Sequence, residues 1–400
     1  MIGKVNLFLC KFTFIMGHKK NIESFISGHF EKGIGYKYFV PSTINHQWEW
    51  NDGSLNTLLE KASIKLGELN SFAKLVPNTD LFIHLHVTKE AVVSSRIEGT
   101  QTTMDEALLP ENEISPERRN DWHEVRNYTE SLNKAIEELK TLPLSSRLLR
   151  KTHNILLKGT RGKHKMPGEY RRSQNWIGGN SISDAAFIPP NFNYVDELMG
   201  DLENFLHNEE IEVPALIRIG IAHYQFETIH PFLDGNGRIG RLLITLYLVS
   251  ERILEKPLLY LSVFFDKNKG LYYENLTRVR EKNDLAQWLK YFLVGVAQTA
   301  EQAVQTLSTI LKLKERLEMD IAKNWGRRSS QALVLLQYLF EEPVIKIKQV
   351  EDICKLSKKS ANELVSEYER AGILVETTGQ ARYRVFVFHE YLNLFKKDMP

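Results

Sequence analysis

One segment of the chain, HPFLDGNGRIGR at 230–241, combines residue types that handle phosphates. Its glycines fall where a helical segment begins, so the backbone can approach an anion closely and the first helical N–H groups are free to bind it. Arg238 and Arg241 are three residues apart, which places both guanidinium groups on one face of that helix. The spacing therefore predicts a cradle for neighbouring phosphates.

The same segment supplies a base and a metal ligand. His230 closes the preceding apolar helix and has the intrinsic proton affinity of a general base. Asp234 offers a hard carboxylate oxygen for a Mg²⁺ that bridges phosphate oxygens. The alternative is an ordinary Asp-Gly turn with His230 as a helix cap, which leaves the gathering of base, acid, glycines and arginines unexplained.

The elements that must position this segment are mainly helices. Apolar residues recur three and four positions apart in seven segments, namely 55–69, 89–98, 119–139, 145–157, 193–206, 215–229 and 240–252. The periodicity returns over 272–298, and 300–324 is expected to be one long connecting helix. Between these helices, 162–190 is rich in Gly, Pro, Ser and Asn, which predicts an extended or hairpin excursion.

The pattern changes after Trp325. Three short helices are expected at 329–340, 350–354 and 360–370, with Ser357 as an N-cap before the last. Strand-like alternation then flanks a Thr378-Gly379 turn, over 373–377 and 383–388. This order resembles a winged helix-turn-helix domain. Its basic residues barely outnumber its acidic ones, so DNA and a protein partner both stay open as its ligand.

Composition sets the outer limits. Four hundred residues suggest two or three units, and 42% hydrophobic with 26% charged residues is typical of a globular chain. The 52 basic and 50 acidic residues give a net charge of +2. This balance excludes a protein that binds nucleic acid over its whole surface. Cys10 and Cys354 are too few and too distant for a disulfide framework, which favours a reducing compartment.

The first sixteen residues are apolar, but Lys4 and Lys11 interrupt them too early for a spanning helix. No small-residue cleavage site follows. We therefore expect a cytoplasmic protein with no membrane association, and Met16 is a candidate natural start.

The segment at 230–241 closely resembles the signature of Fic proteins, HPFxDGNGRxxR, with every specified position present. The resemblance implies transfer of AMP from ATP to a Ser, Thr or Tyr hydroxyl of a target protein, with self-modification included. It implies that His230 takes the hydroxyl proton, that Asp234 holds Mg²⁺, and that Arg241 holds the γ-phosphate. The ATP site that it implies comprises Asp234, Gly235, Asn236, Gly237, Arg238, Arg241, Ile188, Tyr272, Tyr273 and Arg280.

Two further stretches are similar to parts of that family. Residues 168–190 resemble the flap hairpin, whose edge pairs with a target peptide by strand addition, although an ordinary surface loop is the alternative. Tyr272, Tyr273 and Arg280, with Trp288, resemble the adenine side of the pocket, against core packing as the alternative. His223 is expected to be a core histidine rather than a metal ligand.

Upstream, Ser94 to Gly99 matches the inhibitory pattern of the family, (S/T)xxxE(G/N). Gly99 is placed to end a helix and to leave Glu98 at its tip. From there Glu98 is expected to pair bidentately with Arg241 and to occupy the guanidinium that the γ-phosphate needs, with Ser94 as part of the same inhibitory element.

The resulting expectation is a mainly α protein with a small β-hairpin flap. Its parts are an N-terminal helical region with the inhibitory motif (1–140), a Fic catalytic core (141–300), a connecting helix (301–326) and a winged-helix domain (327–400). The leading function is autoinhibited protein adenylyl transfer. The alternatives are a DNA-binding regulator with a nucleotide-sensing core, and a Fic-type transferase that moves phosphate or another nucleotide or removes AMP. A homodimer is a candidate assembly.

Overall fold

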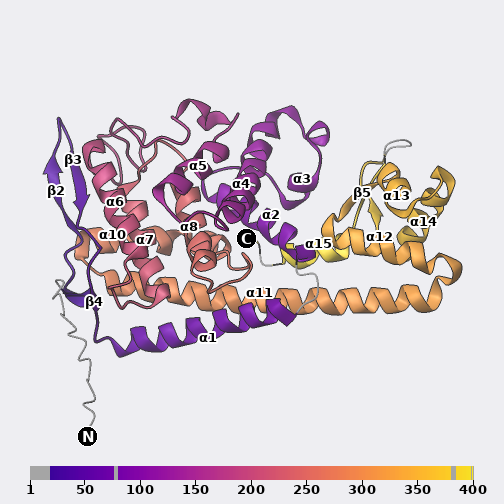
Figure 1. The fold of residues 1–400 in the computed structure, drawn as a ribbon. Coiled ribbons are helices and arrows are strands. Elements are labelled where there is room, and N and C mark those ends of the chain that lie inside the picture. Colours follow the sequence, from indigo (N-terminus) through magenta and orange to yellow (C-terminus); the bar gives the residue numbers. More distant parts are fainter. Residues whose placement is uncertain (1–18, 76–79, 380–383, 398, 400) are drawn as a thin grey trace, which may run out of the picture.

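The computed structural model describes residues 19–75, 80–379, 384–397 and 399, and within them the chain is mainly helical (Figure 1). The α-helices are α1 (Gly53–Leu75), α2 (Asp80–Ile97), α3 (Met104–Leu108), α4 (Arg119–Glu138), α5 (Ser146–Leu156), α6 (Val195–His207), α7 (Ala215–Ile229), α8 (Asn236–Ser250), α9 (Ser262–Lys267), α10 (Lys269–Lys282), α11 (Leu285–Asn324), α12 (Ser329–Glu341), α13 (Ile347–Cys354), α14 (Lys358–Arg370) and α15 (His389–Lys396). The strands are β1 (Lys20–Asn21), β2 (Gly28–Lys32), β3 (Lys37–Pro41), β4 (Trp48–Glu49), β5 (Val344–Lys346), β6 (Val375–Glu376) and β7 (Val385–Val387). The apolar leader and Cys10 lie outside the described residues.

The long helix α11 runs along the lower side of the molecule in Figure 1, and α1 packs beside it. It runs for 40 residues and continues without a break through position 300, where the sequence suggests a domain boundary. A stripe of apolar residues at helical spacing faces the rest of the chain, including Leu307, Ile310 and Leu317. One helix therefore supports both the central part of the chain and the C-terminal elements.

The central pair of helices, α7 and α8, is buried on almost every side. A helix that is apolar all round belongs inside a protein, and α7 follows its expected bounds. The helix α8 begins at Asn236, four residues before the expected segment, and α2 begins at Asp80, nine residues early. The start of α8 is polar and glycine-rich, which hides its apolar period, whereas the start of α2 is apolar and the sequence analysis missed it.

The N-terminal region is not purely helical, which corrects the prediction for 1–140. Strands β2 and β3 form an antiparallel hairpin in which Gly28 pairs with Pro41. A Cβ on Gly28 would lie 2.2 Å from the carbonyl oxygen of Val40, so only glycine allows this close approach. The N–H of Phe39 in β3 donates to the carbonyl of Ile188 at 3.0 Å. The hairpin therefore extends the predicted flap.

The C-terminal elements follow the expected order, with one strand and one helix, β5 and α15, that were not predicted. Helices α12, α13 and α14 precede β6 and β7, and β5, which lies between α12 and α13, completes a sheet of order β5-β7-β6. Ser357 caps α14 as predicted, since its hydroxyl accepts the N–H of Ser360. Phe340 of α12 and Phe395 of α15 contact Phe82 and His86 of α2. These elements therefore pack directly on the helix that leads to Glu98.

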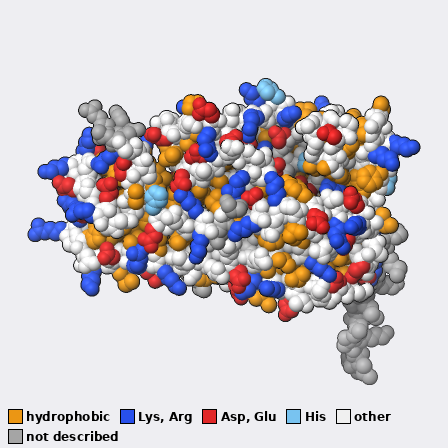
Figure 2. Space-filling view, turned by 180° about the vertical axis from the view of Figure 1, so that it is seen from behind, with side chains coloured by type: hydrophobic (Ala, Val, Ile, Leu, Met, Phe, Trp, Pro, Cys, Tyr) orange, Lys and Arg blue, Asp and Glu red, His pale blue; other side chains and the backbone are white. Residues whose placement is uncertain are grey.

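The surface carries mixed charge. Figure 2 shows basic and acidic side chains interspersed across one face, as the net charge of +2 suggests. Among the described residues no helix is both long and apolar enough to cross a bilayer.

Candidate functional site

The segment at 230–241 turns between two buried helices. His230 lies just after α7 in the left-handed region, with φ of 50°, and Gly235 precedes α8 with φ of 75°. The side chain of Asn236 bonds both the N–H and the carbonyl of Phe232 at 2.8 Å. Asn236 therefore closes the loop with its amide group. The resemblance implies that Asn236 lines an anion hole with the backbone of Gly235 to Gly237, and in this structure its side chain bonds Phe232.

The backbone of His230 is held from the flap. Its carbonyl accepts Nε of Arg171 at 3.0 Å and Nδ2 of Asn175 at 3.1 Å. Arg171 is buried and also donates to the carbonyls of Ile229 and Pro190. These contacts satisfy carbonyls that the end of α7 leaves free and stabilise the left-handed turn.

The imidazole of His230 is oriented by its own helix. Its Nδ1 lies 3.3 Å from the carbonyl oxygen of Glu227, which fixes the proton on Nδ1 and leaves Nε2 with a lone pair. Burial, and then the charge of Arg171, lower the pKa of His230 to about 4. The ring is therefore neutral at pH 7 and able to accept a proton.

Arg241 is paired with the predicted inhibitory residues. Its Nη2 donates to Oε1 of Glu98 at 2.6 Å and to the carbonyl of Ser94 at 2.9 Å, while its Nε donates to the hydroxyl of Ser94 at 2.8 Å. Glu98 follows the last residue of α2, and Gly99 has φ of 101° as expected of a helix-ending glycine. The contact uses one carboxylate oxygen, so the expected bidentate pair is not formed.

The charge state of Glu98 follows from this contact. Burial alone would raise the pKa of Glu98, but the charge of Arg241 and its hydrogen bond outweigh burial and lower it. Glu98 is therefore a carboxylate anion that binds the buried guanidinium of Arg241. A phosphate oxygen would bind the same guanidinium in the same way.

Two glycines of α8 make room for carboxylates. A Cβ on Gly237 would lie 2.3 Å from Oε1 of Glu98, and a Cβ on Gly240 would lie 2.1 Å from Oε1 of Glu227. Glu227 is buried, which raises its pKa to about 7. The glycines of the segment thus admit oxygen atoms close to the helix backbone, as the sequence predicts.

Arg238 is held by a residue that the sequence analysis did not identify. Its Nη1 donates at 3.0 Å to Oε2 of Glu124, and Glu124 Oε1 accepts Nε of Arg161 at 3.0 Å. The resemblance implies contact between Arg238 and phosphate, whereas this structure shows an ion pair with α4. Glu124 lies 114 residues away from Arg238 in the sequence, so no local pattern connects them.

Asp234 lies at the open side of the loop, with 41% of its side chain exposed. Its Oδ1 accepts the N–H of Gly235 at 2.6 Å and lies 3.6 Å from Nη2 of Arg238. Across the described residues, no group of three or more His, Cys, Asp or Glu side chains is arranged to hold a metal ion. A metal at Asp234 would therefore need oxygen ligands from a substrate and water.

A second histidine, His153 of α5, ties the loop to the flap. Its Nε2 donates to the carbonyl of Asp234 at 2.9 Å, its Nδ1 accepts the N–H of Gly168 at 2.9 Å, and its ring stacks on Phe232 at 3.8 Å. Burial lowers the pKa of His153 to about 4, so the neutral ring can make both bonds. Sequence analysis missed His153 because its partners come from other elements.

The predicted flap is a loop with one β-bridge, between Ile177 and Phe187. Arg280, expected at the adenine pocket, lies over the ring of Phe187 at 3.8 Å from its centroid. The carbonyl of Ile188 accepts the N–H of Phe39. One hydrogen-bonding position of the flap is thus occupied by the N-terminal hairpin.

The residues predicted for the adenine side separate into core and surface. Tyr272 is buried and its hydroxyl lies 2.9 Å from Nε2 of His223, while Tyr273 is 42% exposed. His223 also bonds the carbonyl of Gly240 through Nδ1 at 2.8 Å, which confirms a core histidine. Trp288 is buried and donates to the carbonyl of Gly220.

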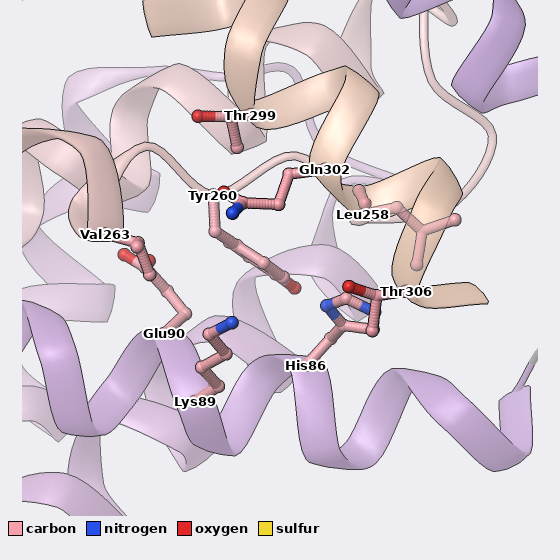
Figure 3. Close-up of a pocket in the computed structure, with 10 residues that line it drawn as sticks. His86, Lys89, Glu90, Leu258, Tyr260, Val263, Thr299, Gln302 and Thr306 are labelled. Carbon is pink, nitrogen blue, oxygen red and sulfur yellow. The ribbon is translucent and has the colours of Figure 1, made fainter. Parts of the chain in front are cut away.

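A small cavity of about 40 Å³ lies between α2, the segment before α9, and α11 (Figure 3). Within the described part of the chain, three buried atoms that border it lack a hydrogen-bond partner, namely His86 Nε2, Glu90 Oε2 and Tyr260 OH. Burial raises the pKa of Glu90 to about 7. A cavity of this size has room for a water molecule beside these polar atoms.

This arrangement of loop, helices and arginines lies within regions that match known families. Residues 56–137 match the Fic/DOC family N-terminal region, and residues 143–248 match the Fic/DOC family. The chain therefore contains Fic N-terminal and Fic domains.

Its relatives include proteins named adenylyltransferases. The protein adenylyltransferase Fic of Drosophila erecta is 27% identical over 175 residues, which cover 41% of this chain and 32% of that protein. A probable protein adenylyltransferase of Aquifex aeolicus is 27% identical over 219 residues, which cover 53% of this chain and 65% of that protein. The chain thus spans about a third of the first relative and less than two thirds of the second.

The fold is shared with a solved structure. A Fic family protein from Desulfovibrio desulfuricans aligns over 84% of this chain and 96% of that chain, with a TM-score of 0.55 and 19% identity. The mainly helical fold therefore agrees with the Fic fold.

Proposed function

We propose that this chain is a protein adenylyltransferase that moves AMP from ATP to a Ser, Thr or Tyr hydroxyl of a protein, and that Glu98 holds it in an inhibited state. One observation carries the proposal. A neutral histidine with a free Nε2 and a buried arginine occupied by a carboxylate lie on the two sides of one glycine-rich helix start. The relatives named adenylyltransferases support this assignment.

His230 is the base in this proposal. Its Nε2 takes the proton of the target hydroxyl while the hydroxyl oxygen bonds to the α-phosphorus of ATP. The bond from that phosphorus to the bridging oxygen breaks, and pyrophosphate leaves. Arg171 and Asn175 hold the backbone of His230, so the ring meets the substrate in a fixed position.

The start of α8 receives the phosphates. The first N–H groups of a helix have no partner within it and point at an anion, and Gly235 and Gly237 let the phosphates approach. Arg238 and Arg241 add two fixed cations, with Arg241 assigned to the γ-phosphate. We also assign to the ATP pocket the side chains of Ile188, Tyr273 and Arg280. The buried Tyr272 packs behind Tyr273 in the core.

Asp234 fits a Mg²⁺ site because it is an exposed carboxylate at the edge of the anion cradle. When bound, Mg²⁺ would neutralise charge on the phosphates. The residue that would hold it from the protein is Asp234.

Glu98 competes with the γ-phosphate for Arg241. While the carboxylate occupies Nη2, the triphosphate is displaced from in-line geometry, and an error of an ångström can cost about a hundredfold in rate. Ser94 also holds this guanidinium, because its hydroxyl accepts Nε of Arg241. We call the contacts of Glu98 and Ser94 with Arg241 the lock.

The test is label transfer from two forms of ATP. The Glu98→Gly protein is incubated with α-labelled or γ-labelled ATP, and the label retained on protein is measured. Adenylyl transfer places only the α-label on protein, whereas phosphate transfer places only the γ-label. Retention of the γ-label would replace the proposal by its phosphotransferase alternative.

A further inference from the structure

Helix α4 presents a polar stripe to the site. Glu124, Asn127 and Tyr128 are three and four residues apart and therefore share a face. Tyr128 OH donates to Glu90 of α2 at 2.8 Å, and Asn127 Nδ2 donates to the carbonyl of Lys158 at 2.6 Å. This face therefore contacts the inhibitory helix and the loop after α5 at the same time.

Glu124 is the member of the stripe that reaches α8. It is 6% exposed and Arg238 is 3% exposed, so their contact at 3.0 Å is a buried ion pair. Such a pair fixes geometry, because without Glu124 the buried Arg238 keeps only the longer contact with Asp234, at 3.6 Å, among the ion pairs of the described residues. Nε of Arg238 has no hydrogen-bond partner among the described residues, so this N–H of the guanidinium is still able to donate a hydrogen bond.

The other oxygen of Glu124 holds the wall next to Asp234. Arg161 opens a short turn in which a Cβ on Gly162 would lie 3.1 Å from Oδ2 of Asp234. Nε of Arg161 donates to Glu124 at 3.0 Å, and its Nη2 donates to Asp121 at 2.9 Å. One carboxylate thus ties both α8 and the turn beside Asp234 to α4.

We infer that Glu124 is a positioning residue that holds Arg238 in place for the phosphates of ATP. The inference rests on the proposed function, since it assigns phosphate contact to Arg238. Glu124 acts through Arg238 and does not touch the substrate. It also gives α4 of the N-terminal region a part in the phosphate site.

The experiment compares variants in a Glu98→Gly background, where the lock is open. Glu124→Gln keeps the shape of the side chain and removes its charge. We expect the Kd for Mg-ATP by calorimetry to rise about tenfold and the rate of α-label transfer to fall about a hundredfold, because Arg238 loses its fixed position. Asp121→Asn is the matched control: it weakens the outer contact of Arg161 and the hydrogen bond from the N–H of Gln101, leaves the contact between Glu124 and Arg238 in place, and should change both quantities less than about twofold.

Coupling separates positioning from a merely structural role. In an Arg238→Ala background, Glu124→Gln should weaken ATP binding by less than about twofold more, because its effect passes through the missing arginine. An additive loss there, or an unchanged Kd for Glu124→Gln in a protein of unaltered melting temperature, would overturn the inference. Asp121→Asn losses as large as those of Glu124→Gln would also overturn it.

The two proposals fail differently. ATP binding that depends on Glu124 through Arg238, without any α-label on protein, contradicts adenylyl transfer and leaves the positioning role standing. Label transfer that ignores Glu124 contradicts the positioning role alone.

Discussion

At the scale of single residues, the site depends on how a neutral histidine and two arginines are held. His230 projects from a left-handed position that Arg171 and Asn175 stabilise from the flap. Arg241 is held by Glu98 and Ser94. Fixed side chains of this kind are what proton transfer and phosphate binding both require.

The first prediction concerns the base. In the Glu98→Gly protein, His230→Ala should reduce label transfer to background and change the Kd for ATP by less than about threefold, because proton abstraction belongs to the transition state. Initial rates and calorimetry measure the two quantities. Comparable label transfer by the alanine variant would exclude His230 as the base.

The second prediction is a pH profile. Because the pKa of His230 is lowered to about 4, the base form is complete at pH 6, and kcat/KM should stay level from pH 7 to pH 5 and fall below it. Glu227, with a pKa raised to about 7, also titrates nearby, so Glu98→Gly/Glu227→Gln serves as the control. A midpoint near 6.5 in that control would show that His230 titrates like an exposed histidine.

The third prediction concerns the lock. Glu98→Gly should raise the initial rate of self-modification at saturating ATP, because Nη2 of Arg241 becomes available to the γ-phosphate. Adding Arg241→Ala should return the rate to or below that of the wild type, and the two effects should be non-additive because the residues share one contact. An unchanged rate for Glu98→Gly in the folded protein would leave Glu98 as an ordinary helix-end carboxylate.

Sequence patterns reveal residues of this kind only when they are neighbours. His230, Asp234 and Arg241 lie within one segment, so their types and spacing are visible together. Glu124 is 114 residues from Arg238, and His153 is 81 residues from Asp234. Such pairs form only when the helices pack, and an isolated Glu or His on a helix gives no signal of its own.

At the scale of elements, the helices with a clear apolar stripe are the ones that the sequence predicts well. The break before α11 is a miss: it lies at Asn283, with φ of 58°, and Asp284 then caps the new helix by accepting the N–H of Gln287. An Asn that tolerates the left-handed region next to an N-capping Asp was a usable signal. Strand β5 is short and pairs with β7 much further along the chain, which local patterns do not encode, whereas the local hairpin of β2 and β3 is a miss of the sequence analysis.

The fourth prediction tests the packing of α7 on α8. Gly240→Ala should lower the free energy of unfolding by about 1–3 kcal/mol, because its Cβ would meet Oε1 of Glu227 at 2.1 Å and Phe226 at 3.1 Å. Gly67→Ala in α1 is the control: nothing lies within 4 Å of its Cβ, and alanine should stabilise the helix by about 0.5–1 kcal/mol. Urea unfolding measures both. Equal stability of the two variants would contradict the close α7–α8 contact.

At the scale of the whole molecule, α2 lies between the C-terminal elements and the site. Its first turns contact α12 and α15 through Phe82–Phe340 and His86–Phe395, and its last turn carries Ser94 and is followed by Glu98. Lys346 and Lys396 add ion pairs to Glu113 and Asp105. We therefore expect that loss of the two aromatic contacts would also change how Glu98 is held.

The fifth prediction follows from that placement. Deleting the residues after Asn324 should keep ATP binding, because all matched elements of the site precede that point, and it should raise the basal rate of self-modification, because the uncovered Phe82 and His86 loosen α2. The rate should approach that of Glu98→Gly, and adding Glu98→Gly to the truncated protein should give little further gain. The full-length double variant Lys346→Gln/Lys396→Gln is the control, since these ion pairs are partly exposed to solvent and contribute little, and its rate should stay within about twofold of the wild type. A folded truncation with the wild-type rate would show that the lock holds without the C-terminal elements, and loss of ATP binding would show that the site extends beyond Asn324.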